Sequence, residues 1–166
     1  LINGAGINAS TDFFNIKESE WDQIFNSQLK GTLFSCQVFG KLMVKNKKGS
    51  IINISSASSN PPLSKAFAYS AAKAGIKNLS HNLAREFASN NVRVNAIRPG
   101  FFPTEWSKKN FITHKRERSI LSHTPMNRYG KPIELISTIV WLASDSSSFV
   151  TGAEIPVDGG FTSMTI

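Results

Sequence analysis

A tyrosine and a lysine stand four residues apart in the stretch Ala68-Tyr69-Ser70-Ala71-Ala72-Lys73. Four residues make about one helical turn, so the Tyr69 phenol and the Lys73 ammonium share a face if this segment is helical. A neighbouring positive charge stabilises phenolate and is expected to lower the pKa of a tyrosine, which is ordinarily about 10. Such a phenol could exchange a proton with a carbonyl or alcohol oxygen near neutral pH.

A pair of serines ends an apolar run upstream of this tyrosine. The run is Gly49-Ser50-Ile51-Ile52-Asn53-Ile54, and Ser55-Ser56 follows it directly. A hydroxyl at the end of a nearby strand could hydrogen-bond the same substrate oxygen as the phenol. Tyrosine and lysine at this spacing alone more often mark an amphipathic helix with a solvated lysine, so the surrounding sequence has to decide.

Strand-like runs and helical patterns alternate along the chain. The strand-like runs lie at Leu1–Asn3, Ile51–Ser55, Val92–Ile97 and Glu154–Val157. The helical patterns lie at Trp21–Lys45, Phe67–Ala88 and Ile133–Leu142. This alternation predicts an α/β fold with a parallel sheet covered on both faces. Ligands of doubly wound sheets bind at the carboxyl ends of the strands, where Asn3-Gly4-Ala5-Gly6, Ser56 and Pro99-Gly100 are expected.

With these motifs in this order, the sequence resembles the classical short-chain dehydrogenase/reductase family over essentially its whole length. Thr104, four residues past Gly100, and Val157-Asp158-Gly159-Gly160 belong to the same resemblance. Leu1-Ile2-Asn3-Gly4-Ala5-Gly6 and the pair Phe101-Phe102 look most like sugar-acid members. Those members are the D-mannonate (fructuronate) oxidoreductase-like and gluconate 5-dehydrogenase-like enzymes.

The resemblance implies a Rossmann-like doubly wound parallel sheet, with residues 1–166 forming a single partial dinucleotide-binding and catalytic domain. Family members carry a Gly-rich pyrophosphate-binding turn well ahead of the motif matched by Asn3-Gly4-Ala5-Gly6. The chain is therefore expected to be the C-terminal portion of the fold, with the first strands and the Gly-rich loop missing. The residues that select the cofactor would lie in that part, so the cofactor is expected to be NAD or NADP.

Catalytic roles follow from the resemblance. Tyr69 would be the acid/base, Lys73 would lower its pKa and bind the nicotinamide ribose, and Ser56 would orient the substrate. Ser55 is the alternative serine, and its other interpretation is a polar strand end. Gln28 stands where the family usually has an asparagine that helps to hold a water molecule on the lysine. Its longer side chain makes a proton relay possible with a different geometry.

Cofactor contacts are implied in the same way, for Asn3, Gly4, Ala5, Tyr69, Lys73, Pro99, Gly100, Phe102 and Thr104. Many members have a second asparagine where this chain has Gly4, which removes one side-chain contact. Arg128 and Asp158 also match family positions, and we interpret them as structural anchors.

Composition excludes several classes of protein. No apolar stretch approaches the roughly 18 residues of a membrane span, and no signal-peptide pattern opens the chain. The single cysteine, Cys36, cannot form an internal disulfide, which favours a cytoplasmic protein. The net charge of +8 is spread over scattered lysines and arginines with no nucleic-acid-binding signature, so neither nucleic acid nor membrane is expected as a partner. No metal site is predicted.

Residues 101–130 form the least regular segment and are the candidate substrate lid. A basic cluster falls there, made of Lys108, Lys109, Lys115, Arg116, Arg118 and Arg128. The cluster indicates either attraction of an anionic small-molecule substrate or a solvated helix.

The predicted function is NAD(P)-dependent hydride transfer on a secondary alcohol or ketone, with a sugar acid such as D-mannonate/fructuronate or gluconate as substrate. One alternative is a 3-oxoacyl-thioester reductase, and another is a non-catalytic fragment or oligomerisation partner. Apolar residues spread around the two long helices predict a homo-oligomer, either a dimer or a tetramer.

Overall fold

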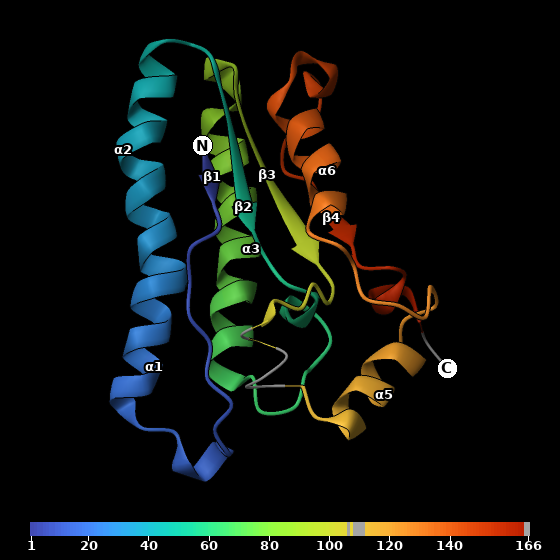
Figure 1. Ribbon diagram of the computed structural model, residues 1–166. Helices are drawn as coiled ribbons and strands as arrows, with labels where there is room; N and C mark the ends of the chain where they lie inside the picture. Colours follow the sequence, from blue (N-terminus) through green and yellow to red (C-terminus); the bar gives the residue numbers. More distant parts are fainter. Residues whose placement is uncertain (106, 108–111, 165–166) are drawn as a thin grey trace.

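The computed structural model describes residues 1–105, 107 and 112–164. Four parallel strands form one sheet in the order β1 (Ile2–Asn3), β2 (Gly49–Ile54), β3 (Val92–Pro99) and β4 (Glu154–Val157). Parallel neighbours need a crossover connection, and helices supply it here, as Figure 1 shows. The α/β fold with a parallel sheet is confirmed.

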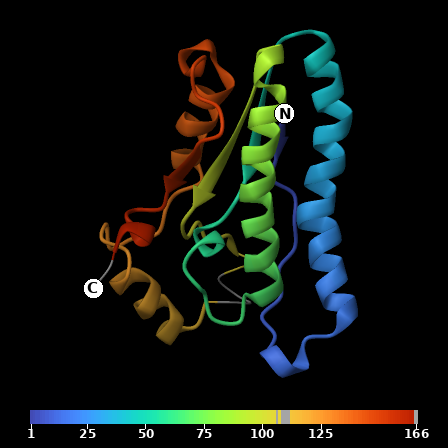
Figure 2. The ribbon, with the colours of Figure 1, turned by 180° about the vertical axis from the view of Figure 1, so that it is seen from behind.

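One face of the sheet is covered by α2 (Gly31–Lys45) and α3 (Phe67–Phe87), and the other by α6 (Ile133–Ala143), while α1 (Glu18–Phe25) packs against α3. Figures 1 and 2 show α2 and α3 side by side in both views, with the strands between them and α6. The sheet is therefore covered by helices on both faces, as doubly wound folds require.

Buried side chains of the strands alternate between two core clusters, because successive residues of a strand point to opposite faces. Ile51, Val92 and Val94 pack with Cys36 of α2 and Ala84 of α3. On the opposite face, Ile52 and Ile97 pack against Leu142 of α6. The two clusters fix the register of the sheet, since a slip of one residue would exchange their members.

The carboxyl ends of the strands meet at one end of the molecule, and the loops that carry the predicted site gather there. Helix α5 (His114–Ser122) lies at this end and is capped by Thr113, whose side chain accepts a hydrogen bond from the Arg116 amide. Only Ile120 of α5 is buried. The segment predicted to be irregular therefore contains a helix with one buried anchor.

The predicted long helix differs from the structure in one respect. Helical backbone runs from Glu18 to Lys45, but residues Asn26–Lys30 form a π-helical turn between α1 and α2. Such turns occur often at functional sites, and the buried Gln28 lies in this one.

In the part of the chain that the structure describes, no helix is long and apolar enough to cross a membrane. Lys108 and Lys109 of the basic cluster lie outside the described residues.

Candidate active site

A cavity of about 840 Å3 lies at the carboxyl end of the sheet. Its walls come from the loop after β1, the turn after β2, the first turns of α3, and the segment from Gly100 into α5. It brings together Ser56, Tyr69 and Lys73. These residues are spread over the sequence, and the parallel topology places them in one cavity because all these loops leave the same end of the sheet.

Tyr69 and Lys73 lie on the first two turns of α3. Lys73 is buried, and its Nζ donates a hydrogen bond of 2.7 Å to the carbonyl oxygen of Ile54, the last residue of β2. The same Nζ lies 5.6 Å from the centroid of the Tyr69 ring. The helix thus places the two groups on one face, and the strand end holds the ammonium beside the phenol.

Ser56 lies in the cavity, whereas Ser55 does not. Ser56 has extended backbone and caps the short 3-10 turn Ala57–Ser59, and its hydroxyl interacts with the Tyr69 phenol closely enough to lower the phenol pKa. Ser55 is fully buried, and its hydroxyl donates to Glu154 at 2.9 Å. The geometry therefore favours Ser56 over Ser55 as the serine that meets a substrate.

The expected direction of the Tyr69 pKa is wrong for this structure. Burial raises the pKa of the phenol above its ordinary value, and the hydrogen bond with Ser56 offsets this only in part. Burial also lowers the pKa of Lys73 to about 8, because a charged ammonium is poorly solvated there. Tyr69 is therefore protonated at neutral pH, and of these two groups Lys73 has the pKa nearer to neutral.

Gln28 reaches the cavity from the π-helical turn. Its Nε2 donates a hydrogen bond of 2.8 Å to the carbonyl oxygen of Ile7, which ties the loop after β1 to the helix. Its Oε1 is buried and has no hydrogen-bond partner among the described residues. A Cβ atom on Gly6 would overlap the Gln28 amide, so this close approach requires glycine at position 6.

The predicted cofactor residues divide into two groups. Six of them line the cavity, namely Gly4, Tyr69, Lys73, Gly100, Phe102 and Thr104. Asn3, Ala5 and Pro99 are not among the lining residues.

The side chain of Asn3 contacts the interior of the fold. Its Nδ2 donates to Asn53 Oδ1 at 2.8 Å and to Cys36 Sγ at 3.3 Å. Asn53 in turn donates to Ser80 of α3. Asn3 therefore joins β1 to β2 and the helices, and through its side chain it supports the loop that reaches the cavity.

Close packing holds the backbone at Gly100 and the ring of Phe102 in place. A Cβ atom on Gly100 would lie 2.7 Å from the Cα of Asp158, so glycine is required for the strand ends to approach. The Phe102 ring lies over Gly130, and the Gly130 amide donates to the Phe101 carbonyl at 3.0 Å. Thr104 is exposed and exchanges hydrogen bonds with Ser107.

The basic residues of the lid segment differ in position. Arg116 is half-buried and lines the cavity. Lys115 and Arg118 are exposed and are not among its lining residues. Of the described lid cations from α5, Arg116 is the one placed to meet a ligand.

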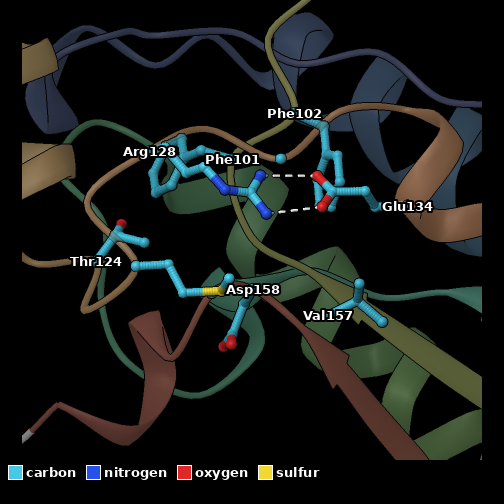
Figure 3. A pocket seen from close by; sticks show the side chains of 10 residues that line it. Phe101, Phe102, Thr124, Arg128, Glu134, Val157 and Asp158 are labelled. Carbon is cyan, nitrogen blue, oxygen red and sulfur yellow. Dashed lines mark hydrogen bonds and ion pairs between the residues drawn. The ribbon is translucent and has the colours of Figure 1, made fainter.

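A smaller cavity of about 110 Å3 lies beside the site, and Figure 3 shows its lining. Arg128 donates two hydrogen bonds to the Glu134 carboxylate, of 2.8 and 2.7 Å, and one to the Tyr129 carbonyl. Asp158 accepts from the amides of Gly160 and Thr162 and so closes the turn after β4. The contacts made by Arg128 fix the end of the lid segment to the first turn of α6.

Sequence reasoning did not find Glu154. Its side chain is 7% exposed and contacts Ser55, Ser59 and Arg98 beneath the site. The sequence offered one indication of its role, because Glu154 is a charged residue at the start of an otherwise apolar strand. Buried carboxylates are rare unless they are paired.

Known proteins are similar to this chain over almost its whole length. The family model described as enoyl-(acyl carrier protein) reductase matches residues 1–162. An uncharacterized oxidoreductase of Bacillus subtilis is 43% identical, over 97% of this chain and 66% of its own length. A 3-oxoacyl-[acyl-carrier-protein] reductase of Thermotoga maritima is 40% identical, over 96% of this chain and 64% of its own.

Solved structures show the same fold. A gluconate 5-dehydrogenase from Burkholderia cenocepacia, in complex with NADP and tartrate, superposes with a TM-score of 0.95 at 28% identity. The match covers 99% of this chain and 64% of that one.

The chain belongs to the short-chain dehydrogenase/reductase family. It spans about two thirds of the length of the relatives it matches.

Proposed function

We propose that this chain carries the catalytic part of an NAD(P)-dependent oxidoreductase, which transfers a hydride between a nicotinamide cofactor and a secondary alcohol or ketone. The observation that carries the proposal is the joint presence of Ser56, Tyr69 and Lys73 in one cavity. A phenol and a hydroxyl that line the same cavity can both reach one substrate oxygen.

The residues present fit the nicotinamide half of such a cofactor. Gly4 and Gly100 expose backbone to the cavity, and the buried Oε1 of Gln28 lacks a partner that a ligand or a water molecule could supply. When bound, the cofactor supplies or accepts the hydride. Phe102 and Thr104 lie where they could hold a carboxamide, and Lys73 where it could meet a ribose hydroxyl.

Tyr69 moves the proton in this scheme. Because burial raises its pKa, the phenol carries its proton at neutral pH and can give it to a carbonyl oxygen. Ser56 donates a hydrogen bond to the same oxygen and so holds the carbonyl in place. In the direction of alcohol oxidation Tyr69 takes the proton back, and Lys73 beside it favours the phenolate.

The substrate class we propose is a sugar acid. Arg116 lines the cavity and could hold a carboxylate through two parallel hydrogen bonds. The similar gluconate 5-dehydrogenase structure, which is in complex with NADP and tartrate, a hydroxy-dicarboxylate, supports a sugar acid as the substrate class.

A second candidate is reduction of a 3-oxoacyl thioester. The Thermotoga maritima relative, at 40% identity, supports it.

Assays of the full-length protein with a reduced nicotinamide cofactor would separate the candidates, using a keto-sugar acid, the matching neutral ketose and a 3-oxoacyl thioester. Preference for the keto acid over both supports a sugar-acid oxidoreductase. Preference for the thioester supports the second candidate, and no turnover of any carbonyl contradicts both.

We also propose a cytoplasmic homo-oligomer built through α2 and α3. The outer face of α2 exposes Phe34, Val38, Phe39 and Leu42. An apolar groove of about 520 Å3 runs between the helical segment Phe25–Leu33 and residues Gly75–Asn82 of α3. A helix that is apolar on a second face needs a further partner, and another copy would supply one. Light scattering that reports a monomer at all concentrations would contradict this proposal.

A further inference from the structure

Glu154 is the first residue of β4 and places a carboxylate under the turn that carries Ser56. Its Oε1 accepts hydrogen bonds from the hydroxyls of Ser55, at 2.9 Å, and Ser59, at 3.2 Å. These two serines stand on either side of Ser56 in the sequence. One carboxylate oxygen therefore holds the backbone both before and after the residue assigned to the substrate.

The turn has further contacts that make it a single unit. The Ser59 hydroxyl shares its one proton between Glu154 Oε1 and the Ser56 carbonyl, which lies nearer at 2.7 Å. Ser58 donates to the Ser56 hydroxyl oxygen from its amide and from its own hydroxyl, at 3.2 and 3.1 Å. A displacement of Ser59 would therefore move Ser56 as well. Ser56 Oγ also interacts with the Tyr69 phenol, so the position of this oxygen relative to the phenol depends on the turn.

The second oxygen of Glu154 is held by cations. Arg98 Nη1 lies 3.1 Å from Oε2 and Lys77 Nζ lies 3.6 Å from it. Arg98 Nη2 also donates to the hydroxyl of Thr162, which itself bonds Asp158. The carboxylate thus joins the Ser56 turn to the turn after β4, against which Gly100 packs.

This carboxylate is also costly to bury. Its side chain is 7% exposed, and a charged group at that depth is stable only with close partners. An apolar residue would pack there without that cost, but it could accept no hydrogen bond from Ser55 or Ser59.

We propose that Glu154 is a positioning residue for Ser56, holding its turn so that the serine hydroxyl meets the phenol and the substrate oxygen at one point. The inference rests on the proposed function, because that function assigns Ser56 to the substrate. Glu154 itself lies behind the turn, is not among the cavity-lining residues, and acts through the serines on either side.

The main test compares Glu154→Ala with Glu154→Gln in the full-length protein. Alanine removes the contacts to both serines, and kcat should fall by about 10- to 100-fold, because small misplacements of reacting groups cost that much. The cofactor KM should be unchanged. Glutamine can accept from Arg98 with its oxygen and donate to the two serine oxygens with its amide, so it should restore most of kcat. Glu86→Ala, which removes an exposed carboxylate from the last turn of α3 and does not touch the cavity lining, is the control and should leave kcat unchanged.

A double-mutant cycle distinguishes positioning from general support of the fold. If Glu154 acts through Ser56, Glu154→Ala should lower kcat in the parent but not further in a Ser56→Ala background. An equal loss in both backgrounds would show that Glu154 acts independently of Ser56 and would overturn the inference. Full activity of Ser56→Ala would remove the proposed role of Ser56, and this inference with it.

A second variant applies if Glu154→Ala does not fold. The double substitution Ser55→Ala with Ser59→Ala removes the hydroxyls but keeps the ion pair of Glu154 with Arg98. We expect a folded protein with lowered kcat. Unchanged kcat in this folded variant would overturn the inference.

Discussion

The floor and the roof of the cavity are built in different ways. The floor consists of the Ser56 turn and the first turns of α3, where Lys73, Ser55 and Ser58 are buried and hydrogen-bonded to neighbouring segments. The roof is the segment from Phe101 to Tyr129, where α5 has one buried residue and Thr104 bonds only its neighbour Ser107 among the hydrogen bonds described. The floor is held by buried hydrogen bonds. The roof is held at its ends, where Phe101 and His123 pack edge-on against the Phe161 ring and the Met126 amide donates to the Gly159 carbonyl, whereas α5 between these ends has Ile120 as its one buried residue.

This contrast suggests a division of tasks. Proton transfer needs atoms held within a fraction of an ångström, so it belongs on the floor. Recognition of a substrate can rest on a longer, adaptable segment, so it belongs on the roof. Substitutions in the floor should therefore change turnover, and substitutions in the roof should change the choice of substrate.

The largest effect is expected for Tyr69→Phe, in the floor. Phenylalanine keeps the ring but has no proton to give, and general acid/base catalysis contributes about 10²–10⁴-fold. Turnover should fall by that factor, with little change in the far-ultraviolet circular dichroism spectrum. Activity within tenfold of the parent would contradict the assignment of proton transfer to Tyr69 in the floor.

The pH dependence of turnover by the unsubstituted protein also tests the assignment of proton transfer to Tyr69. Because the Tyr69 pKa is raised, ketone reduction should proceed at neutral pH, while alcohol oxidation should become faster as the pH rises. Alcohol oxidation that is independent of pH would contradict this.

The next largest effect is expected for Lys73→Met, which should lower turnover and raise the free energy of unfolding. Burial lowers the Lys73 pKa to about 8, and at about 1.4 kcal/mol per pKa unit the charged lysine costs the fold about 3 kcal/mol at neutral pH. That cost is fully present below pH 8 and disappears as the pH rises from about 8 toward the pKa of an unfolded lysine. Methionine should remove most of it, offset by the lost hydrogen bond to Ile54.

Two measurements check this expectation. Denaturant unfolding at pH 7 should show a more stable Lys73→Met protein, and the rise in parent stability between pH 8 and 10 should be absent from the variant. Turnover should fall by about 10²-fold, the lower end of the range for acid/base help. A less stable variant at pH 7 would show that the contact with Ile54 outweighs the burial of charge.

A moderate effect is expected in the roof from Arg116→Gln. Loss of a charge-assisted hydrogen bond should lower kcat/KM for a keto-sugar acid by about tenfold and leave the matching neutral sugar unaffected. Arg118→Gln is the matched control, because Arg118 is exposed and does not line the cavity. Equal effects of the two substitutions, removed by added salt, would indicate long-range attraction instead of contact.

The smallest effect is expected for Glu134→Gln at the end of the roof. The Arg128 guanidinium holds the Glu134 pKa at about 2, so the ion pair contributes stability above the ordinary carboxylate pKa and loses it as the pH falls toward 2. The pair is exposed to solvent and its contribution at neutral pH should be near the limit of measurement. Unfolding curves at pH 7 and pH 3 check this, and a large loss at pH 7 would show that the roof is fixed more firmly than its contacts indicate.

Local patterns were enough to predict the strands, the long helices and the shared face of Tyr69 and Lys73, because these depend on periodicity. The family resemblance then ordered the loops around one cavity, and the structure brings Ser56, Gly4, Gly100 and Thr104 together there.

Local patterns could not predict features that depend on how deeply a side chain is buried or on which residues pair across the sheet. The Tyr69 pKa follows burial, which a four-residue spacing does not reveal. Asn3 contacts Asn53 because β1 and β2 pair in register, with Asn3 opposite Asn53. The π-helical turn at Gln28 and the contacts of Glu154 likewise depend on segments far away in the sequence.

The contact between Ser55 and Glu154 has a consequence for the order in which the protein is made. The two residues are 99 positions apart, and a ribosome that adds about 5–20 residues per second needs about 5–20 seconds to pass from one to the other. During that interval the Ser56 turn emerges with α3 but without its carboxylate. A nascent chain can therefore pair β1 with β2 before Glu154 has been made, while the position of Ser56 is fixed only after β4 has been synthesised.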